Sequence, residues 1–182
     1  MAGDTANPRI WINADVYVAP VGTSAPTDTT TALNVAYEAL GLLSEDGMTE
    51  SRDQDSTDFY AYGGILVRTV RSKFKRTFKV IALEDTPVVF DLVNPGSSAS
   101  TAGGVTTRTV KVPSTPNPKA WVIETVDGTI TRRRAIPNAE VTELADINIS
   151  DSEITAYEMT LTVYPDADGI LYYDITDDPQ AA

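Results

Sequence analysis

Carboxylates dominate the side chains in this sequence that could do chemistry. The 182 residues include 26 Asp and Glu but no His and no Cys. The lack of His excludes a serine–histidine relay and a His-built metal site, and the lack of Cys excludes disulfides and thiolate nucleophiles. Paired carboxylates can hydrolyse glycosides, but no pair stands out by its spacing. We therefore expect no enzyme and no cofactor.

Two groups of acids partly match cation sites. Asp166-Ala167-Asp168-Gly169 resembles the start of a calcium-binding loop, but a third ligand before the glycine and the closing glutamate are missing. An Asp-Gly turn is the favoured interpretation. Asp53, Asp55 and Asp58 could also surround a cation, although an acidic solvated segment is favoured there. No metal site is expected.

Charge is unevenly distributed along the chain. The formal net charge is −12. Residues 67–83 contain six basic and no acidic residues, whereas residues 137–182 contain 11 acidic and no basic residues. Such an acidic chain repels phosphate backbones, so specific binding of nucleic acid is not expected. A basic segment between acidic ends favours head-to-tail association of copies, although solvated faces of separate strands would give the same pattern.

Alternating apolar residues predict an all-β fold, a β-sandwich or barrel, over a single domain 1–182. The chain contains 24 Thr and 17 Val, which are β-branched strand formers. Residues 10–18 alternate. Residues 66–83 form one long strand, or two joined by a bend, with apolar side chains at even positions such as Phe74 and Phe78 and basic ones at odd positions such as Lys73 and Lys75. Asp127-Gly128 predicts a hairpin. No apolar run approaches the ~18 residues of a membrane span, so no membrane is expected.

One short helix is predicted beside the strands. Thr86 and Pro87 are typical of a helix start, and Asn94-Pro95-Gly96 is typical of a helix end. Val89, Leu92 and Val93 share one face at the i, i+3, i+4 spacing. We expect this face to pack on the core of the strands.

Two segments are expected to be loops. The first, at about 40–64, shows little periodicity and is predicted to be an extended acidic arm that contacts other subunits. Its acids are Glu45, Asp46, Glu50, Asp53, Asp55 and Asp58. The second, at about 95–104, contains small residues and is predicted to be flexible. Arg132, Arg133 and Arg134 lie in a predicted strand, where they must alternate between faces and pair with acids such as Glu124, Glu140 or Glu143.

Three passages, in this order, resemble the major tail proteins, or tail tube subunits, of long-tailed (siphophage-type) bacteriophages. The first is Gly41-Leu42-Leu43-Ser44-Glu45-Asp46-Gly47-Met48, similar to a "GYxSEDG" segment of that family. The second is the strand 74–83 followed by the helix 87–93. The third begins at Ile136-Pro137-Asn138-Ala139-Glu140-Val141, similar to "IPxAxVTE", and ends at Val163-Tyr164-Pro165-Asp166, similar to "AYPD". The resemblance covers roughly residues 33–175, with small departures such as Leu43.

The resemblance implies a structural virion protein with a tail-tube-like fold. Such subunits form hexameric rings that stack on a tape-measure protein and end at tail-end proteins, and DNA passes through the channel without specific binding. The protein would be assembled in the cytoplasm of the bacterial host. In such a tube we expect Lys73, Lys75 or Lys79 of one subunit to meet acids of residues 45–58, or of the C-terminal strands, of a neighbour. The channel wall should then be acidic or neutral.

A monomeric all-β binding module, carbohydrate-binding or adhesin-like, is the alternative. It would require a concave platform of aromatic side chains. Candidates are Trp11, Trp121, Tyr60, Tyr62, Tyr172 and Tyr173. Trp121 is expected in the core instead. An enzyme ranks third, because it would need a pocket that shifts the pKa of a carboxylate.

Overall fold

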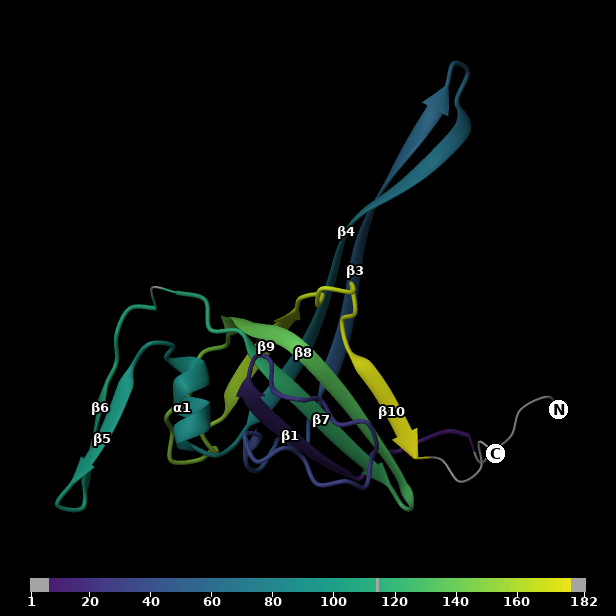
Figure 1. Ribbon diagram of the computed structural model, residues 1–182. Coiled ribbons are helices and arrows are strands. Elements are labelled where there is room, and N and C mark those ends of the chain that lie inside the picture. The colour runs from purple at the N-terminus through teal and green to yellow at the C-terminus, as the bar shows by residue number, and fades with distance from the viewer. Residues whose placement is uncertain (1–6, 114, 178–182) are drawn as a thin grey trace.

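A single antiparallel sheet of eight strands forms the body of the protein (Figure 1). The computed structural model describes residues 7–113 and 115–177, so the two ends of the predicted domain lie outside the described residues. Along the sheet the strands follow the order β2-β1-β7-β8-β9-β4-β3, and β10 pairs with β8. The strands are β1 (Asn13–Pro20), β2 (Glu38–Ala39), β3 (Thr49–Ala61), β4 (Ile65–Ala82), β7 (Lys119–Asp127), β8 (Ile130–Leu144), β9 (Tyr157–Val163) and β10 (Tyr173–Asp177). The all-β fold with one short helix is thus confirmed.

The long strand β8 joins two halves of the sheet. Its first part pairs with β7 on one side and β10 on the other, and its second part pairs with β9. Apolar side chains from both halves belong to one buried cluster. Its members include Val16, Val18, Phe78, Val80, Trp121, Ile123, Ile136, Met159, Leu161 and Val163. The strand alternation expected from the sequence places these residues on one face. On the opposite face, β1, β7 and β8 also bury apolar side chains, namely Ala19, Val122 and Ala135.

The predicted helix is α1 (Pro87–Val93). The Thr86 hydroxyl caps its start by accepting a hydrogen bond from the backbone N–H of Val89, at 3.2 Å. Val89 and Leu92 are buried in the core cluster, and the partly buried Val93 packs against it. The helix contacts β8 and β9. Within the described residues, no helix is long and apolar enough to cross a membrane.

The prediction of a loop at about 40–64 is wrong over most of that range, because residues 49–61 form strand β3. Taken as whole residues, all 13 residues of β3 are exposed, although the side chain of Glu50 at its base is only 25% exposed. They pair with β4 in a hairpin that extends far from the body (Figure 1). A strand without a buried face has no reason to alternate apolar and polar residues. The periodicity that would have predicted β3 is therefore missing, and pairing with β4 decides its structure.

The prediction of a flexible loop at about 95–104 is also wrong, because half of this range forms a strand. Residues 98–102 are strand β5 (Ser98–Ala102), which pairs with β6 (Val105–Thr109) in a separate two-stranded sheet. Gly103 and Gly104 form the two-residue connection, and both have positive φ angles, of 58° and 80°. Turns of this kind match the twist of a hairpin and favour glycine.

The first predicted strand is shifted toward the C-terminus. Ile10 and Ile12, which were expected on its apolar face, precede β1 and are exposed. The reason is the length of the neighbouring strand, since β7 ends one residue beyond the partner of Asn13. The hairpin at Asp127-Gly128 between β7 and β8 is confirmed.

We predict that Leu92→Asp destabilises the protein by at least about 3 kcal/mol, because it places a charge without a partner in the core and removes a large apolar side chain. Urea unfolding measures the change. Val35→Asp is the control, since Val35 is 96% exposed and the same substitution there should change the free energy of unfolding by less than about 0.5 kcal/mol. Equal stability of the two variants would show that the helix face is not part of the core.

Candidate assembly surface

Four neighbouring strands, β8, β9, β4 and β3, form a layer with one buried and one polar face. On the buried face, Phe78 lies opposite Leu161 and Val80 opposite Met159. We call the other side the polar sheet face. It carries Ser51, Asp53, Lys75, Thr77, Lys79, Glu140, Glu143, Glu158, Thr160 and Thr162. Six of these residues line one shallow depression of about 200 Å³. Acids outnumber lysines on this face.

The same layer has an unpaired edge at each end. β3 is the last strand of the sheet and pairs with β4 alone. At the other end, residues 140–144 of β8 pair with β9 on one side, and within the described residues no strand pairs with their other side. Unpaired strand edges expose rows of backbone N–H and C=O groups that can pair with another chain.

The tip of the β3–β4 hairpin is apolar and exposed. Tyr62 in the connecting turn is fully exposed, and the large side chains on both sides of the turn are each more than half exposed. These are Phe59, Tyr60, Ile65, Leu66 and Val67. An apolar cluster of this kind at the end of a projecting hairpin marks a surface that another molecule covers.

Lys73 sits at a β-bulge in the hairpin. Gln54 lies opposite Phe74 and Asp55 opposite Ser72, so Lys73 is the extra residue between them. Its φ angle of 50° is in the left-handed region, which the Cβ atom of any residue other than glycine disfavours. A bulge bends its strand and increases the local twist, and so this residue shapes the outer part of the hairpin.

The structure separates five of the six predicted acids into three places, and the sixth is Glu50. Glu45 and Asp46 lie in the turn before β3, where Ser44 donates a hydrogen bond to Asp46 at 3.1 Å. Asp53 lies on the polar sheet face, and Asp55 lies on the same side of β3 but farther along the hairpin. Asp58 lies on the opposite side of the hairpin and accepts a hydrogen bond from Thr69 at 2.6 Å. Because Asp58 faces away from Asp53 and Asp55, these three acids do not surround a common cation.

Two of the three predicted lysines find acids within their own chain. The ammonium of Lys73 lies 3.3 Å from Asp55, and that of Lys79 lies 2.8 Å from Glu158. Lys75 is opposite Asp53 in register but has no ion pair among the described residues. Exposed pairs of this kind contribute little stability, so neighbouring copies can exchange them at small cost.

Sequence reasoning missed the role of Glu50, which is bound at the base of the hairpin. Its carboxylate accepts from Arg76 at 2.5 Å and from the Tyr172 hydroxyl at 3.0 Å, and Arg134 lies 3.4 Å away. In the sequence, Glu50 is one of several acids without periodicity. The partners come from distant segments, so no local signal distinguishes it.

The three consecutive arginines alternate between faces as predicted. Arg133 pairs with Glu124 at 2.5 Å, which was one of the three expected partners. Arg132 pairs instead with Asp174 on β10, and Arg134 contacts Glu50. Of the other two expected partners, Glu140 accepts from the backbone N–H of Asn117 at 2.8 Å and Glu143 lies on the polar sheet face. The arginines therefore join strands and do not form a phosphate-binding patch.

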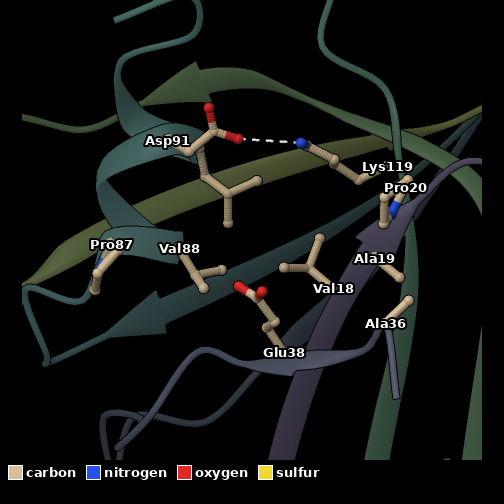
Figure 2. A pocket seen from close by; sticks show the side chains of 10 residues that line it. Val18, Ala19, Pro20, Ala36, Glu38, Pro87, Val88, Asp91 and Lys119 are labelled. Atoms are coloured by element: carbon tan, nitrogen blue, oxygen red, sulfur yellow. Dashed lines mark ion pairs between the residues drawn. The ribbon is translucent and has the colours of Figure 1, made fainter. Parts of the chain in front are cut away.

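A pocket of about 280 Å³ lies beside α1 (Figure 2). Val18 and Val88 face each other across it, and Glu38 points between them (Figure 2). Asp91 of α1 pairs with Lys119 of β7 at 3.0 Å and bridges one side. An ion pair and one carboxylate among apolar side chains supply no nucleophile with an adjacent base.

Trp121, Tyr60 and Tyr172 lie in different parts of the structure, and Asp166 and Asp168 belong to a turn. Trp121 is buried and donates to the Ala139 carbonyl at 3.2 Å, whereas Tyr60 and Tyr62 lie at the hairpin tip. Tyr172 packs edge-on against Phe78 at the base of the hairpin. Asp166 accepts from the backbone N–H groups of residues 168 and 170, at 2.9 and 2.8 Å, as in a capped turn.

The family model for "Phage tail tube protein" matches residues 1–182. The chain therefore belongs to the phage tail tube protein family. It is a structural component of a phage tail tube, a virion protein and not an enzyme. No curated protein matches the sequence.

Three solved structures are similar to this chain at low sequence identity. The sheath–tube complex of an extracellular contractile injection system, PVC, shares 13% identity with a TM-score of 0.46 over 97% of this chain and 99% of that chain. The sheath/tube terminator of PVC shares 14% identity with a TM-score of 0.48, over 96% and 100%. A chain of the native gene transfer agent virion shares 11% identity with a TM-score of 0.41, over 80% and 92%.

Acid should weaken the fold through Asp28 and Asp174. The backbone N–H of Thr31 and further hydrogen bonds lower the pKa of Asp28 to about 2, and the hydrogen bond from Arg132 lowers the pKa of Asp174. Because both groups are more acidic folded than unfolded, their stabilisation is complete above about pH 4 and is lost as pH falls through the folded pKa values.

Thermal melting between pH 5 and pH 2.5 tests this prediction. Asp174→Asn lacks the titrating carboxylate. Its melting temperature should therefore fall less between pH 5 and pH 2.5 than that of the wild type. Asp151→Asn, at an exposed position, should lose as much as the wild type. The account fails if Asp174→Asn and the wild type respond equally to acid.

Proposed function

We propose that this chain builds hexameric rings that stack into the tail tube of a long-tailed phage and form the channel through which DNA is ejected into the bacterial host. The observation that carries the proposal is the layer β8-β9-β4-β3, which combines a buried face, a polar face and two unpaired edges. These three features are what a ring with a polar lumen requires of each subunit.

The strand directions are compatible with ring closure. β8, β9, β4 and β3 are all paired antiparallel, so their directions alternate across the layer. The edge of β3 in one copy and residues 140–144 of β8 in the next would therefore also run antiparallel. Joining these edges in every subunit pairs the exposed backbone groups and closes a barrel without free edges.

The polar sheet face would line the lumen. The other face of the layer is covered by the core of the subunit, so the channel must take the polar side. Its serine and threonine side chains are neutral, and its acids outnumber its lysines. Lysines that have acidic neighbours hold phosphates weakly, and DNA can then slide past without specific binding.

The hairpin would reach a subunit of the next ring. Residues 51–75 contain five basic and three acidic residues, in a chain with 14 basic and 26 acidic residues overall. A positively charged hairpin with an apolar tip is thus complementary to the acidic remainder of a second copy. Head-to-tail stacking brings these unlike surfaces together at every step along the tube. Tape-measure and tail-end proteins would contact the finished tube, assembled in the host cytoplasm.

Shortening the hairpin should abolish tubes and leave a folded subunit. Ser56 and Arg71 are opposite in register, so residues 57–70 can be replaced by Asn-Gly, a two-residue turn that suits a hairpin. Electron microscopy and light scattering should show no tubes, with a melting temperature close to that of the wild type. Val105→Ser, in the other hairpin, is the control and should assemble. Normal tubes from the shortened protein would refute the proposed role of the hairpin.

Charge reversal tests the head-to-tail contact. Lys73 lies on the hairpin outside the polar sheet face, and its side chain is 83% exposed. Lys73→Glu should weaken each contact by about 1 kcal/mol, which raises the concentration needed for assembly about fivefold. Lys111→Glu, also exposed, changes the net charge equally and should assemble like the wild type. Rising salt should weaken wild-type assembly as well. Equal assembly of both variants, independent of salt, would exclude an electrostatic contact through Lys73.

A further inference from the structure

The β3–β4 hairpin is attached to the body along a short stretch of one strand. β4 pairs with β9 from Thr77 to Ala82, and β3 pairs with β4 alone. Beyond Thr77 the hairpin is a two-stranded ribbon that leaves the sheet (Figure 1). Isolated ribbons of two strands twist and bend readily. A second attachment is therefore needed if the hairpin is to keep one direction.

Glu50 provides contacts to the body at the point where the hairpin leaves it. It lies on β3, opposite Phe78 of β4. Its Oε1 atom accepts from Nη1 of Arg76 at 2.5 Å and from the Tyr172 hydroxyl at 3.0 Å, and its Oε2 atom lies 3.4 Å from Nη1 of Arg134. Arg134 belongs to β8, and Tyr172 lies just before β10. One carboxylate thus connects β3 with two segments on the other half of the sheet.

The other polar contacts of β3 remain inside the hairpin. Within the described part of the chain, Arg52 bonds Gln54 at 3.2 Å, Asp55 pairs with Lys73 and Asp58 bonds Thr69. These contacts stiffen the ribbon but do not connect it with the body. Glu50 differs from them because two of its partners come from outside the hairpin.

The Glu50 carboxylate and its two arginine partners are partly buried. Its side chain is 25% exposed, and those of Arg76 and Arg134 are 19% and 24% exposed. The Arg76 guanidinium lies 5.3 Å from the centre of the Tyr172 ring, which packs in turn on Phe78. Without the carboxylate, two guanidinium groups would share this half-buried site with no opposite charge from β3.

We propose that Glu50 is the positioning residue that fixes the direction in which the β3–β4 hairpin leaves the body. Its carboxylate holds β3 to Arg134 and Tyr172, and the ribbon cannot swing about β4 while these contacts persist. The consequence for tube assembly rests on the proposed function, but the direction of the hairpin is a property of the single chain.

A distance measurement in the dilute, unassembled protein tests this role. The chain has no Cys, so two introduced cysteines can carry spin labels without removing native ones. Suitable positions are Asp15, exposed on β1, and Tyr62, at the hairpin tip. Pulsed electron paramagnetic resonance then gives the distance distribution between hairpin tip and body for each variant. Asp53→Asn is the matched control, an acid-to-amide change on the other face of the same strand.

The wild type and Asp53→Asn should give the same narrow distribution. Glu50→Gln should at least double its width while the protein melts near the wild-type temperature. An unchanged distribution in Glu50→Gln would overturn the proposal. If Glu50→Gln does not fold, Tyr172→Phe decides, because it removes the hydroxyl that donates to Glu50 and accepts from Arg76 but keeps the ring against Phe78. A broader distribution supports the role and an unchanged one refutes it. Failure of the wild type to form tubes would refute the proposed function and leave this result intact.

Discussion

The alternation of side chains along β-strands is the constraint on which the rest of this structure depends. In the layer β8-β9-β4-β3, it sends Phe78, Val80, Met159 and Leu161 into the core and leaves serine, threonine, lysine and acidic side chains on the opposite face. A sheet with one face buried in the core and one polar face does not need a second layer of structure over the polar face. The same layer can therefore serve as the wall of a subunit and as a surface in contact with water.

Strand β4 serves two purposes because it is longer than the sheet it joins. Its last six residues pair with β9 and help to bury the core, whereas its first part pairs with β3 in the projecting hairpin. The length that carries the apolar tip away from the body also deprives the hairpin of support. Contacts at the exit point, centred on Glu50, supply that support, and the bulge at Lys73 shapes the ribbon beyond them. Stability and reach are thus assigned to different parts of one strand.

Elements with a buried face could be predicted from the sequence, and exposed elements could not. The alternation in β9, the capped start of α1 and the Asp127-Gly128 turn each reflect a local rule, and each matches the structure. β3 lacks alternation because none of its side chains enters the core, so its strand character comes from pairing with β4. The glycine pair 103–104 is compatible both with a flexible loop and with a hairpin turn, and the sequence alone does not distinguish them. The contacts of Glu50 join segments about 26, 84 and 122 residues apart, which no local pattern encodes.

In the proposed tube, the unpaired edges of the layer join between copies and its polar face turns inward. A cryo-electron microscopy map of the assembled protein would show both features. We expect a tube in which β3 of each subunit pairs antiparallel with residues 140–144 of its neighbour, and in which Asp53, Thr77 and Glu143 line the channel. A tube with these side chains on its outer surface, or with β3 unpaired along its length, would refute this arrangement.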